Sequence, residues 1–300
     1  MTHLFMGDFA EARISLERAP EIFDPARDSG NTFRYGHDLI VGAAANLARA
    51  LWPLGEAERA RQIAERMNAR AAEISHVGTA AYAQMMAAIF EMSRRDFARV
   101  EIHARALVRL TREHEMEQWK AFGQFFEGWL GLRGGERDDG LAQMRAGVDQ
   151  LEARKIVAHV GPIKVALAEA EAATGASATA LRVLDEAIAA SEGAGQRWFD
   201  AEFHRARGGI LLAQTPADPA PAEDAFLAAI VIAQSQKARS FELRAALALA
   251  KLYQSTNRPI EAHDALGPAL EGFAPTPEFP EIAEALELLA AIRQAGWAAS

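Results

Sequence analysis

The chain contains no cysteine, and this absence excludes several kinds of chemistry. Without thiols there can be no disulfide, no thiolate zinc site and no cysteine nucleophile. The composition is compatible with a reducing compartment, and we expect a cytoplasmic protein. The first residues include Asp8 and Glu11 and lack a basic start followed by an apolar run, so we predict no signal peptide.

Long apolar runs and basic clusters are also missing. The longest apolar run, Ala225 to Ala233, has nine residues, which is too short to cross a membrane. The 32 basic and 41 acidic residues give a net charge of −9, and Lys and Arg nowhere gather densely. Nucleic-acid and membrane binding are therefore disfavoured.

No motif for catalysis or metal binding stands out. A phosphate-binding loop needs glycines before Lys-Ser or Lys-Thr, and neither Gly134–Gly135 nor Gly208–Gly209 is followed by such a pair. The eight histidines include no His-x3-His pair of the kind that binds zinc on a helix. We therefore predict no catalytic residue, no metal site and no cofactor, and we interpret the glycine pairs as a hairpin turn and a close helix contact.

Alanine and leucine make up most of the hydrophobic half of the sequence. Both favour helices, and the residues that favour strands are sparse, so we predict an all-α fold. Three hundred residues exceed what one compact helical core usually holds. An elongated array, in which each unit packs only on its neighbours, is the better expectation.

Turn signals recur at a fixed spacing, which is typical of repeat proteins. Four turns are each 40 residues apart: Gly55, Arg95, Gly135 and Gly175. A further turn is expected before these four at Gly7, and another after them at Asn257–Arg258, beyond the proline-rich loop 215–221.

Residues of similar size recur inside each unit. One position of the first helix is always small: Ala48, Ala88, Gly128, Ala168, Gly208 and Ala250. Twelve residues later, or fourteen across the longer loop 215–221, the second helix has Ala60, Val100, Gly140, Ala180, Ala222 and Ala262, and the partial first unit has Ala12 at this position. Two further columns follow at offsets of four and seven: Leu16, Ala64, Ala104, Met144, Leu184, Phe226, Leu266, then Ala19, Met67, Leu107, Gly147, Ala187, Ala229, Ala269. Since these offsets share one helix face, we predict closely packed antiparallel helices.

We predict one domain over residues 1–300, a superhelical solenoid of helical hairpins with a period of about 40 residues. The segment Asp24–Arg34 is expected to be a loop, and a C-terminal capping helix is expected at 280–294. A partial first hairpin covers 1–23, and the full hairpins cover about 36–74, 77–114, 116–154, 158–193, 198–236 and 240–273.

The order of small and large columns resembles the tetratricopeptide-repeat consensus. That family's usual period is 34 residues, and helices longer by about three residues each would absorb the difference. The family's helix-ending proline is replaced here, for example by Ala72 and Arg112.

Several blocks more closely resemble the C-terminal repeat region of bacterial multidomain regulators. In those proteins a class III adenylate or guanylate cyclase domain, or a DNA-binding domain, precedes a signalling ATPase domain and then a helical array. The blocks are Tyr35–Asp38, Leu47–Gly55, Arg197–Trp198, Ala201–Arg205, Ala238–Ala246 and Glu271–Phe273. The resemblance implies a non-catalytic regulatory arm, and the half-length first hairpin favours a fragment of a longer regulator.

Aromatic and charged residues near the starts of first helices are the candidates for binding. First helices line the concave face of such arrays, and aromatic and Arg residues are typical of interaction hot spots. The same residue types also fill grooves between repeats and form surface ion pairs. The candidates are Arg34, Tyr35, His37, Asp38, Trp52, Trp119, Arg197, Trp198, Glu202, His204 and Arg205.

Two functions follow from these observations. The first is a regulatory module that binds a protein partner or self-associates. The alternative is a metabolite sensor that binds a small effector near Tyr35, His37, Arg197 and Trp198. An enzyme with an unrecognised site is a third hypothesis.

The aromatic run Phe122, Phe125, Phe126 and Trp129 shares one helix face and is predicted to be core.

Overall fold

The computed structural model describes residues 2–28, 30–156 and 158–298, and this part of the chain contains helices and no strand. The predicted all-helical fold is confirmed. The helices are α1 Thr2–Met6, α2 Phe9–Glu17, α3 Ala19–Ile22, α4 Pro25–Asp28, α5 Asn31–Tyr35, α6 Leu39–Leu51, α7 Ala57–Glu73, α8 Val77–Arg94, α9 Phe97–Glu113, α10 Lys120–Arg133, α11 Arg137–Ala153, α12 Gly161–Ala173, α13 Ser177–Ala194, α14 Asp200–Gln214, α15 Ala220–Ser235, α16 Arg239–Ser255, α17 Pro259–Leu270 and α18 Glu281–Ala298.

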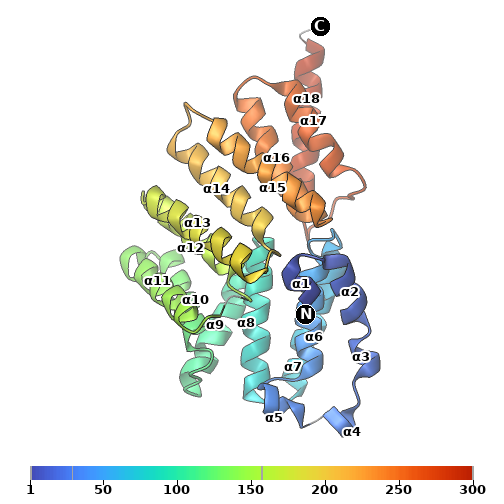
Figure 1. Cartoon of the computed structure of the whole chain (residues 1–300), viewed down its shortest axis with the longest axis vertical. Coiled ribbons are helices and arrows are strands. Elements are labelled where there is room, and N and C mark those ends of the chain that lie inside the picture. Colours follow the sequence, from blue (N-terminus) through green and yellow to red (C-terminus); the bar gives the residue numbers. More distant parts are fainter. Residues whose placement is uncertain (1, 29, 157, 299–300) are drawn as a thin grey trace.

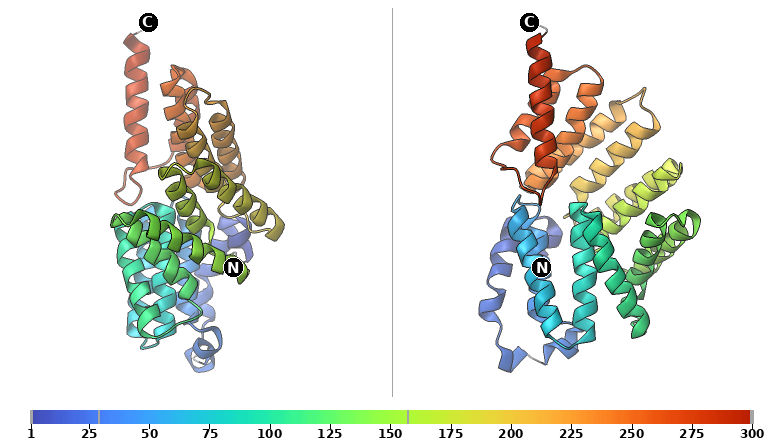
Figure 2. Two further views of the ribbon diagram at one scale, coloured as in Figure 1. Left: turned by 90° about the vertical axis from the view of Figure 1, so that its left-hand side faces the viewer. Right: turned by 180° about the vertical axis from the view of Figure 1, so that it is seen from behind.

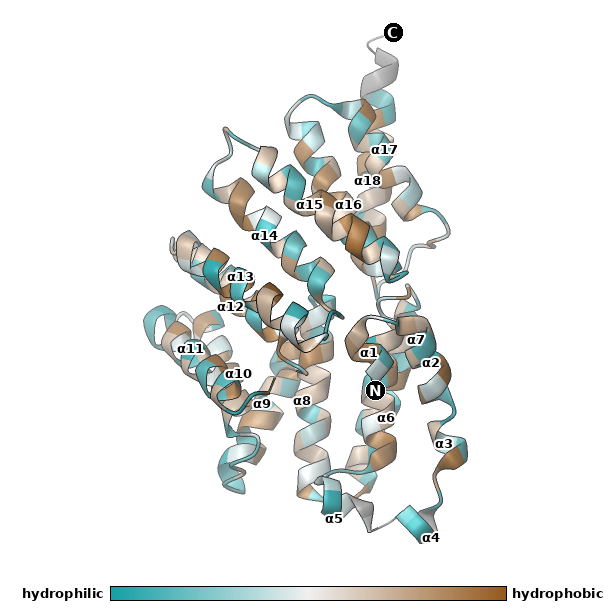
Figure 3. Ribbon diagram, viewed as in Figure 1, coloured by the Kyte–Doolittle hydropathy of each residue, from teal (hydrophilic) through white to brown (hydrophobic). Residues whose placement is uncertain are grey.

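The longer helices pack in consecutive pairs, α6 with α7 and so on to α16 with α17 (Figure 1). The helices α1 and α2 form a shorter pair at the N-terminus, and α18 packs against α16 and α17. Two views show α8 between the N-terminal helices and the pair α10–α11 (Figures 1 and 2). Each long helix carries both hydrophobic and hydrophilic residues (Figure 3), as helices that bury one face require.

The turn inside several pairs has the same backbone geometry. Gly55, Arg95, Gly135 and Gly175 all have a left-handed backbone, with φ of 89°, 64°, 100° and 88°. The N–H of the next residue bonds a carbonyl five residues back, as from Glu56 to Leu51 at 3.1 Å. This arrangement satisfies carbonyl groups at a helix end and makes a compact reversal of direction.

The residues of the recurring columns are mostly buried, and the glycines among them lie where paired helices touch. Every column residue is buried except Ala19, which is partly exposed. The closest approach is between α10 and α11, where a Cβ atom added at Gly128 would lie 2.5 Å from the Gly140 carbonyl oxygen. Glycine at both positions therefore lets the two backbones meet.

The N-terminal helices also contact helices far along the chain. The Trp198 N–H donates to the Phe5 carbonyl at 3.2 Å, and the Ser240 N–H donates to the Pro53 carbonyl at 2.9 Å. The Phe9 and Phe241 rings meet edge to face with centroids 6.2 Å apart. In Figure 1 the blue helices accordingly lie directly below the orange ones. The expectation that each unit packs only on its neighbours is therefore wrong for this end.

Two details of the structure differ from the sequence-based expectations, and a third agrees with them. The segment Asp24–Arg34, expected as a loop, contains the single-turn helix α4 and all but the last residue of the short helix α5. The C-terminal helix α18 runs to Ala298, beyond the expected end at residue 294. The prediction of a core aromatic run is confirmed by the exposures of four side chains, which are 2%, 0%, 0% and 6% for Phe122, Phe125, Phe126 and Trp129.

Candidate functional site

The eleven candidate residues do not share one open groove. Arg34, Tyr35 and Arg197 are exposed, and Tyr35 is 53% exposed. His37, Trp119, His204 and Arg205 are partly buried. Asp38, Trp52, Trp198 and Glu202 are buried, with exposures of 5%, 1%, 3% and 2%. The prediction that these last four lie on an open binding face is wrong. Asp38 is covered by its own helix pair, and Trp52, Trp198 and Glu202 are covered by residues distant in the sequence.

Asp38 has a local structural role at the start of α6. Its side chain accepts a hydrogen bond from the Val41 N–H at 2.9 Å and so caps the helix. The Arg70 guanidinium bonds both carboxylate oxygens, at 2.8 and 2.9 Å. Burial alone would raise the pKa of Asp38, but the hydrogen bonds from Arg70 and the Val41 backbone hold it below its ordinary value.

One of the candidates, Trp198, packs on a residue that the sequence did not single out, Arg49 on α6. Arg49 is 2% exposed, and its Cζ atom lies 4.2 Å from the centre of the Trp198 ring. Its Nη1 atom donates to Nδ1 of His159 at 2.9 Å. The second candidate, His37, reaches the same region through Tyr82, with which it stacks at 3.9 Å and an angle of 5°.

Gly42 makes room for this stack. A Cβ atom at Gly42 would lie 2.9 Å from Nε2 of His37 and 3.9 Å from the Tyr82 hydroxyl. A larger residue on this turn of α6 would displace the histidine ring. Trp119 extends the cluster, since its ring centroid is 6.0 Å from that of Tyr82. We call Asn46, Arg49, His37, Tyr82, His159 and Trp198 the Arg49 cluster.

The Arg49 cluster carries one positive charge. Burial lowers the pKa of Arg49 to about 10, so the guanidinium remains protonated at neutral pH. Burial and the charge of Arg49 hold the pKa of His159 well below its ordinary value, and burial also lowers the pKa of His37. Both histidines are therefore neutral at pH 7, and His159 accepts the hydrogen bond at Nδ1.

A second cluster surrounds Trp52 at the turn after α6. The Cζ atoms of Arg94 and Arg244 lie 5.6 and 5.1 Å from the centre of its ring, and the Phe279 ring packs on it at 4.6 Å. Arg244 donates to the carbonyl oxygens of Ser93 and Arg94, at 2.6 and 2.7 Å. This arginine therefore ties α16 to the end of α8, and we call the group the Trp52 cluster.

Glutamates balance the arginines of the Trp52 cluster. Arg94 pairs with Glu91 and Glu278, each at 2.6 Å, and Arg244 pairs with Glu281 at 2.8 Å. Burial alone would raise the pKa of another candidate, Glu202, but Arg205, Arg244 and Arg95 lower it below its ordinary value. The candidates Glu202 and Arg205 thus belong to a buried ion network rather than to a free surface.

Glu91 gives the Trp52 cluster a predicted pH dependence. Burial raises the pKa of this carboxyl group from 4.5 to about 7, against the attraction of Arg94 and Arg61. A raised pKa keeps the proton on the folded protein after the unfolded chain has lost it. Stability from this group is therefore complete below pH 4.5 and falls as pH rises toward 7, by about 2 kcal/mol between about pH 5 and about pH 7.

Glu91→Gln is expected to remove this part of the pH dependence, measured by urea unfolding over a pH series. The comparison with the native chain isolates Glu91 from groups of opposite slope. His103 is one of these, because burial lowers its pKa to about 4. Parallel pH profiles for the two proteins would show that Glu91 titrates normally.

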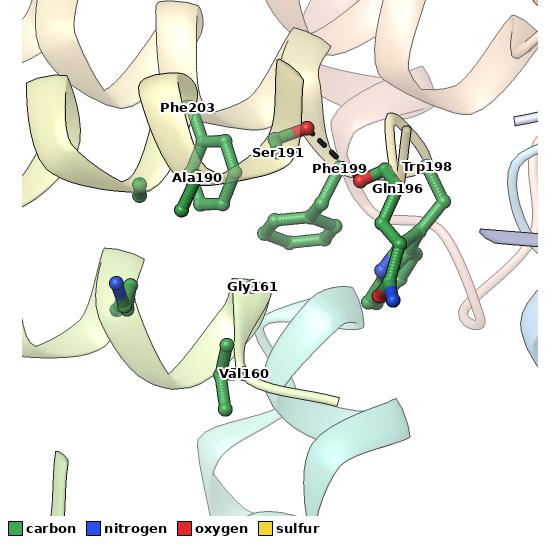
Figure 4. A pocket seen from close by; sticks show the side chains of 10 residues that line it. Val160, Gly161, Ala190, Ser191, Gln196, Trp198, Phe199 and Phe203 are labelled. Atoms are coloured by element: carbon green, nitrogen blue, oxygen red, sulfur yellow. Dashed lines mark hydrogen bonds between the residues drawn. The ribbon is translucent and has the colours of Figure 1, made fainter. Parts of the chain in front are cut away.

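Arg197 and Ser191 hold the segment before α14. Arg197 pairs with Asp200 at 3.0 Å, and the Ser191 hydroxyl donates to the Gln196 carbonyl at 2.9 Å and also contacts Asp200. Beside them lies a cavity of about 30 Å³ between α12, α13 and α14 (Figure 4). It has room for one or two water molecules and not for a metabolite.

Larger depressions lie along α9, α10 and α11. They have volumes of about 610 and 850 Å³ and share Arg112 and Glu127, which form an ion pair. Both are open and lined by side chains of both charges. No group of three or more potential metal ligands is found over residues 2–28, 30–156 and 158–298, and no helix there is long and apolar enough to cross a membrane.

Arg49 and Arg244 were not among the candidates, although a sequence signal exists for both. Each arginine has apolar neighbours in the sequence: Arg49 lies within Leu47–Leu51, and Arg244 lies between Leu243 and the run Ala245–Leu247. A charge at such a position needs a buried partner. Which partner it finds is decided by helices more than 100 residues away, as the contacts of Arg49 with His159 and of Arg244 with Ser93 show.

Comparison with known proteins gives one informative relative. No protein-family model matches the chain. An uncharacterised protein of Rhizobium meliloti is 27% identical over 243 residues, which cover 80% of this chain and 23% of the relative. The chain therefore resembles less than a quarter of a much longer protein.

Proposed function

We propose that this chain is a non-catalytic regulatory module that binds a protein partner, built as a tetratricopeptide-like solenoid with a period of about 40 residues. The observation that carries the proposal is the repeated hairpin. The same left-handed turn recurs at Gly55, Arg95, Gly135 and Gly175, the small column residues are buried except Ala19, and Gly128, Gly140, Gly147 and Gly208 lie where paired helices meet. Stacked helical hairpins of this kind present extended surfaces to partners.

The proposed place in a larger protein is the regulatory arm of a multidomain bacterial regulator. It is supported by the resemblance of the blocks such as Leu47–Gly55 and Ala238–Ala246 to the C-terminal arrays of such regulators. The length of the rhizobial relative is compatible with it, because the matched region is 23% of that protein. In this proposal any enzymatic activity belongs to other domains.

The proposed partner surface is the pair of depressions along α9–α11. Arg105, Arg109 and Arg112 lie on one face of α9 at offsets of four and three and line the first depression. Arg109 has no ion pair among the described residues, whereas Arg105 pairs with Glu101. Glu113 and Glu136 line the same depression, so the surface suits a partner segment with charges of both signs.

Sedimentation velocity tests this function. The chain is examined alone and mixed with the part of the rhizobial relative outside the matched region, which is the partner that the resemblance suggests. We expect a heavier complex in the mixture. Charge reversal at Arg105 and Arg109 is expected to weaken this complex at least about tenfold, because unfavourable charge juxtaposition costs several kcal/mol.

Arg182→Glu is the matched control. Arg182 is 61% exposed on α13 and lies outside both depressions, so its reversal should leave the complex intact. A heavier species formed by the chain alone would identify self-association as the interaction. Sedimentation as a monomer in both experiments would contradict the proposed function.

A further inference from the structure

Arg49 is unlike the other buried arginines of this protein. Arg61, Arg94 and Arg244 are also less than a tenth exposed, and each has a glutamate within 4 Å. In the described part of the chain Arg49 has no carboxylate at that distance. A buried cation without a counter-charge costs several kcal/mol, so proteins rarely leave one unpaired.

The hydrogen bonds of Arg49 are also incomplete. A guanidinium has five N–H donors. Nη1 contacts His159 at 2.9 Å and the Asn46 side-chain oxygen at 3.5 Å, and Nη2 contacts the Ala158 carbonyl at 3.4 Å. Nε is buried and has no hydrogen-bond partner among the residues that the structure describes. Nε and Nη2 together form one edge of the guanidinium, and this edge matches the two oxygens of a carboxylate.

The surroundings of Arg49 favour a monoanion with an apolar body. The neighbouring histidines are neutral, so the Arg49 cluster has one positive charge, which a monoanion would neutralise. A dianion such as phosphate would bring a second, unpaired negative charge. The Trp198 ring lies 4.2 Å from the Arg49 Cζ atom and the Phe5 ring 5.7 Å from it. Aromatic faces of this kind pack well against an apolar group.

The short helix α1 covers the Arg49 cluster. Its Phe5 ring lies 5.8 Å from the His159 ring, and the Phe5 carbonyl accepts the Trp198 N–H. Of the five residues in α1, Thr2, His3 and Met6 are exposed, and Leu4 alone is fully buried. Few contacts hold this helix, so it is the element whose displacement would admit a ligand to Arg49.

We propose that the Arg49 cluster binds the carboxylate of a small monocarboxylic acid beneath α1. The Nε–Nη2 edge of Arg49 donates two hydrogen bonds to the carboxylate, and the Trp198 and Phe5 rings enclose the rest of the molecule. This site specifies where the chain would bind its ligand if its function is metabolite sensing, the alternative to partner binding. It does not depend on the partner surface along α9–α11, which lies on other helices.

Thermal unfolding in sodium benzoate, sodium acetate and sodium phosphate at constant ionic strength tests this site. We expect a saturable rise of about 2 °C with benzoate, because a ligand that binds only the folded state stabilises it and the unfolding entropy of a chain of 300 residues makes the shift in melting temperature small. Acetate should give a smaller rise and phosphate none that saturates. Arg182→Gln, at an exposed arginine of α13, should respond as the native chain does.

Two variants locate the effect. Arg49→Gln removes the charge and should abolish the response to benzoate. Asn46→Asp retains Arg49 and places a carboxylate where the Asn46 oxygen now lies 3.5 Å from Nη1, so it should abolish the response even if Arg49→Gln fails to fold. The proposal is overturned if the native chain shows no saturable rise, if phosphate acts as benzoate does, or if Asn46→Asp responds like the native chain.

Discussion

Replacement of Arg244 by methionine is expected to lower the free energy of unfolding by about 3–5 kcal/mol. The Arg244 side chain is 3% exposed and holds three groups at once, the carbonyls of Ser93 and Arg94 and the carboxylate of Glu281. Methionine has a similar length and fills much of the volume, but it donates no hydrogen bond. The two carbonyls and the glutamate would lose their donor in a dry environment, which is the costly part of breaking a buried ion pair.

Urea unfolding of Arg244→Met beside Arg182→Met measures this effect. Arg182 forms an exposed ion pair with Glu186 one helical turn away, at 2.8 Å. Exposed pairs of this kind contribute little to stability because water screens them, so the control variant should unfold close to the native chain. Equal losses for the two variants would mean that Arg244 does not join α8 to α16 in solution.

Gly128→Leu is expected to cost about 3 kcal/mol or more and to separate α10 from α11. A Cβ atom at this position would lie 2.5 Å from the Gly140 carbonyl oxygen and 2.6 Å from the Met144 backbone nitrogen. Both obstacles are backbone atoms, so a side-chain rotation cannot relieve the clash and the helices must move apart. The measurement is again urea unfolding, with circular dichroism to confirm that the helices remain.

Gly209→Leu is the matched control for Gly128→Leu. Gly209 also lies inside a helix, and an added Cβ atom there would meet nothing within 4 Å. Leucine favours the helical backbone over glycine by about 0.5–1 kcal/mol, so this variant should be slightly more stable than the native chain. If Gly128→Leu also stabilised the protein, the close crossing of α10 and α11 would be wrong.

The recurring features of this fold are visible in the sequence because they are local. Left-handed turns require glycine or tolerate a few other residues, and this requirement marks Gly55, Gly135 and Gly175, which are separated by multiples of 40 residues. Close helix crossings exclude large side chains, and this exclusion marks positions such as Ala48 and Ala60, both now seen to be buried. Each signal depends on residues within one hairpin.

The candidate binding residues were harder to predict for the opposite reason. Trp52 and Trp198 are residues of a type that is common at binding surfaces. Whether they are exposed depends on helices that are distant in sequence. Trp52 is covered by Arg94, Arg244 and Phe279, and Trp198 by Arg49. The local sequence around an aromatic residue at a helix end is the same whether solvent or another helix covers the side chain, so the sequence alone does not predict its exposure.

The sequence by itself determined the helical class, the hairpin turns and the faces on which helices of a pair meet, because helix propensity, turn conformation and side-chain size act over short stretches of chain. Only the tertiary structure decided which charges are paired. Arg244 reaches carbonyl groups 150 and 151 residues away, while Arg49 meets His159 and no carboxylate in the described chain. The strength of a buried charge interaction depends on distance and on the exclusion of water, and both are set when distant helices come together.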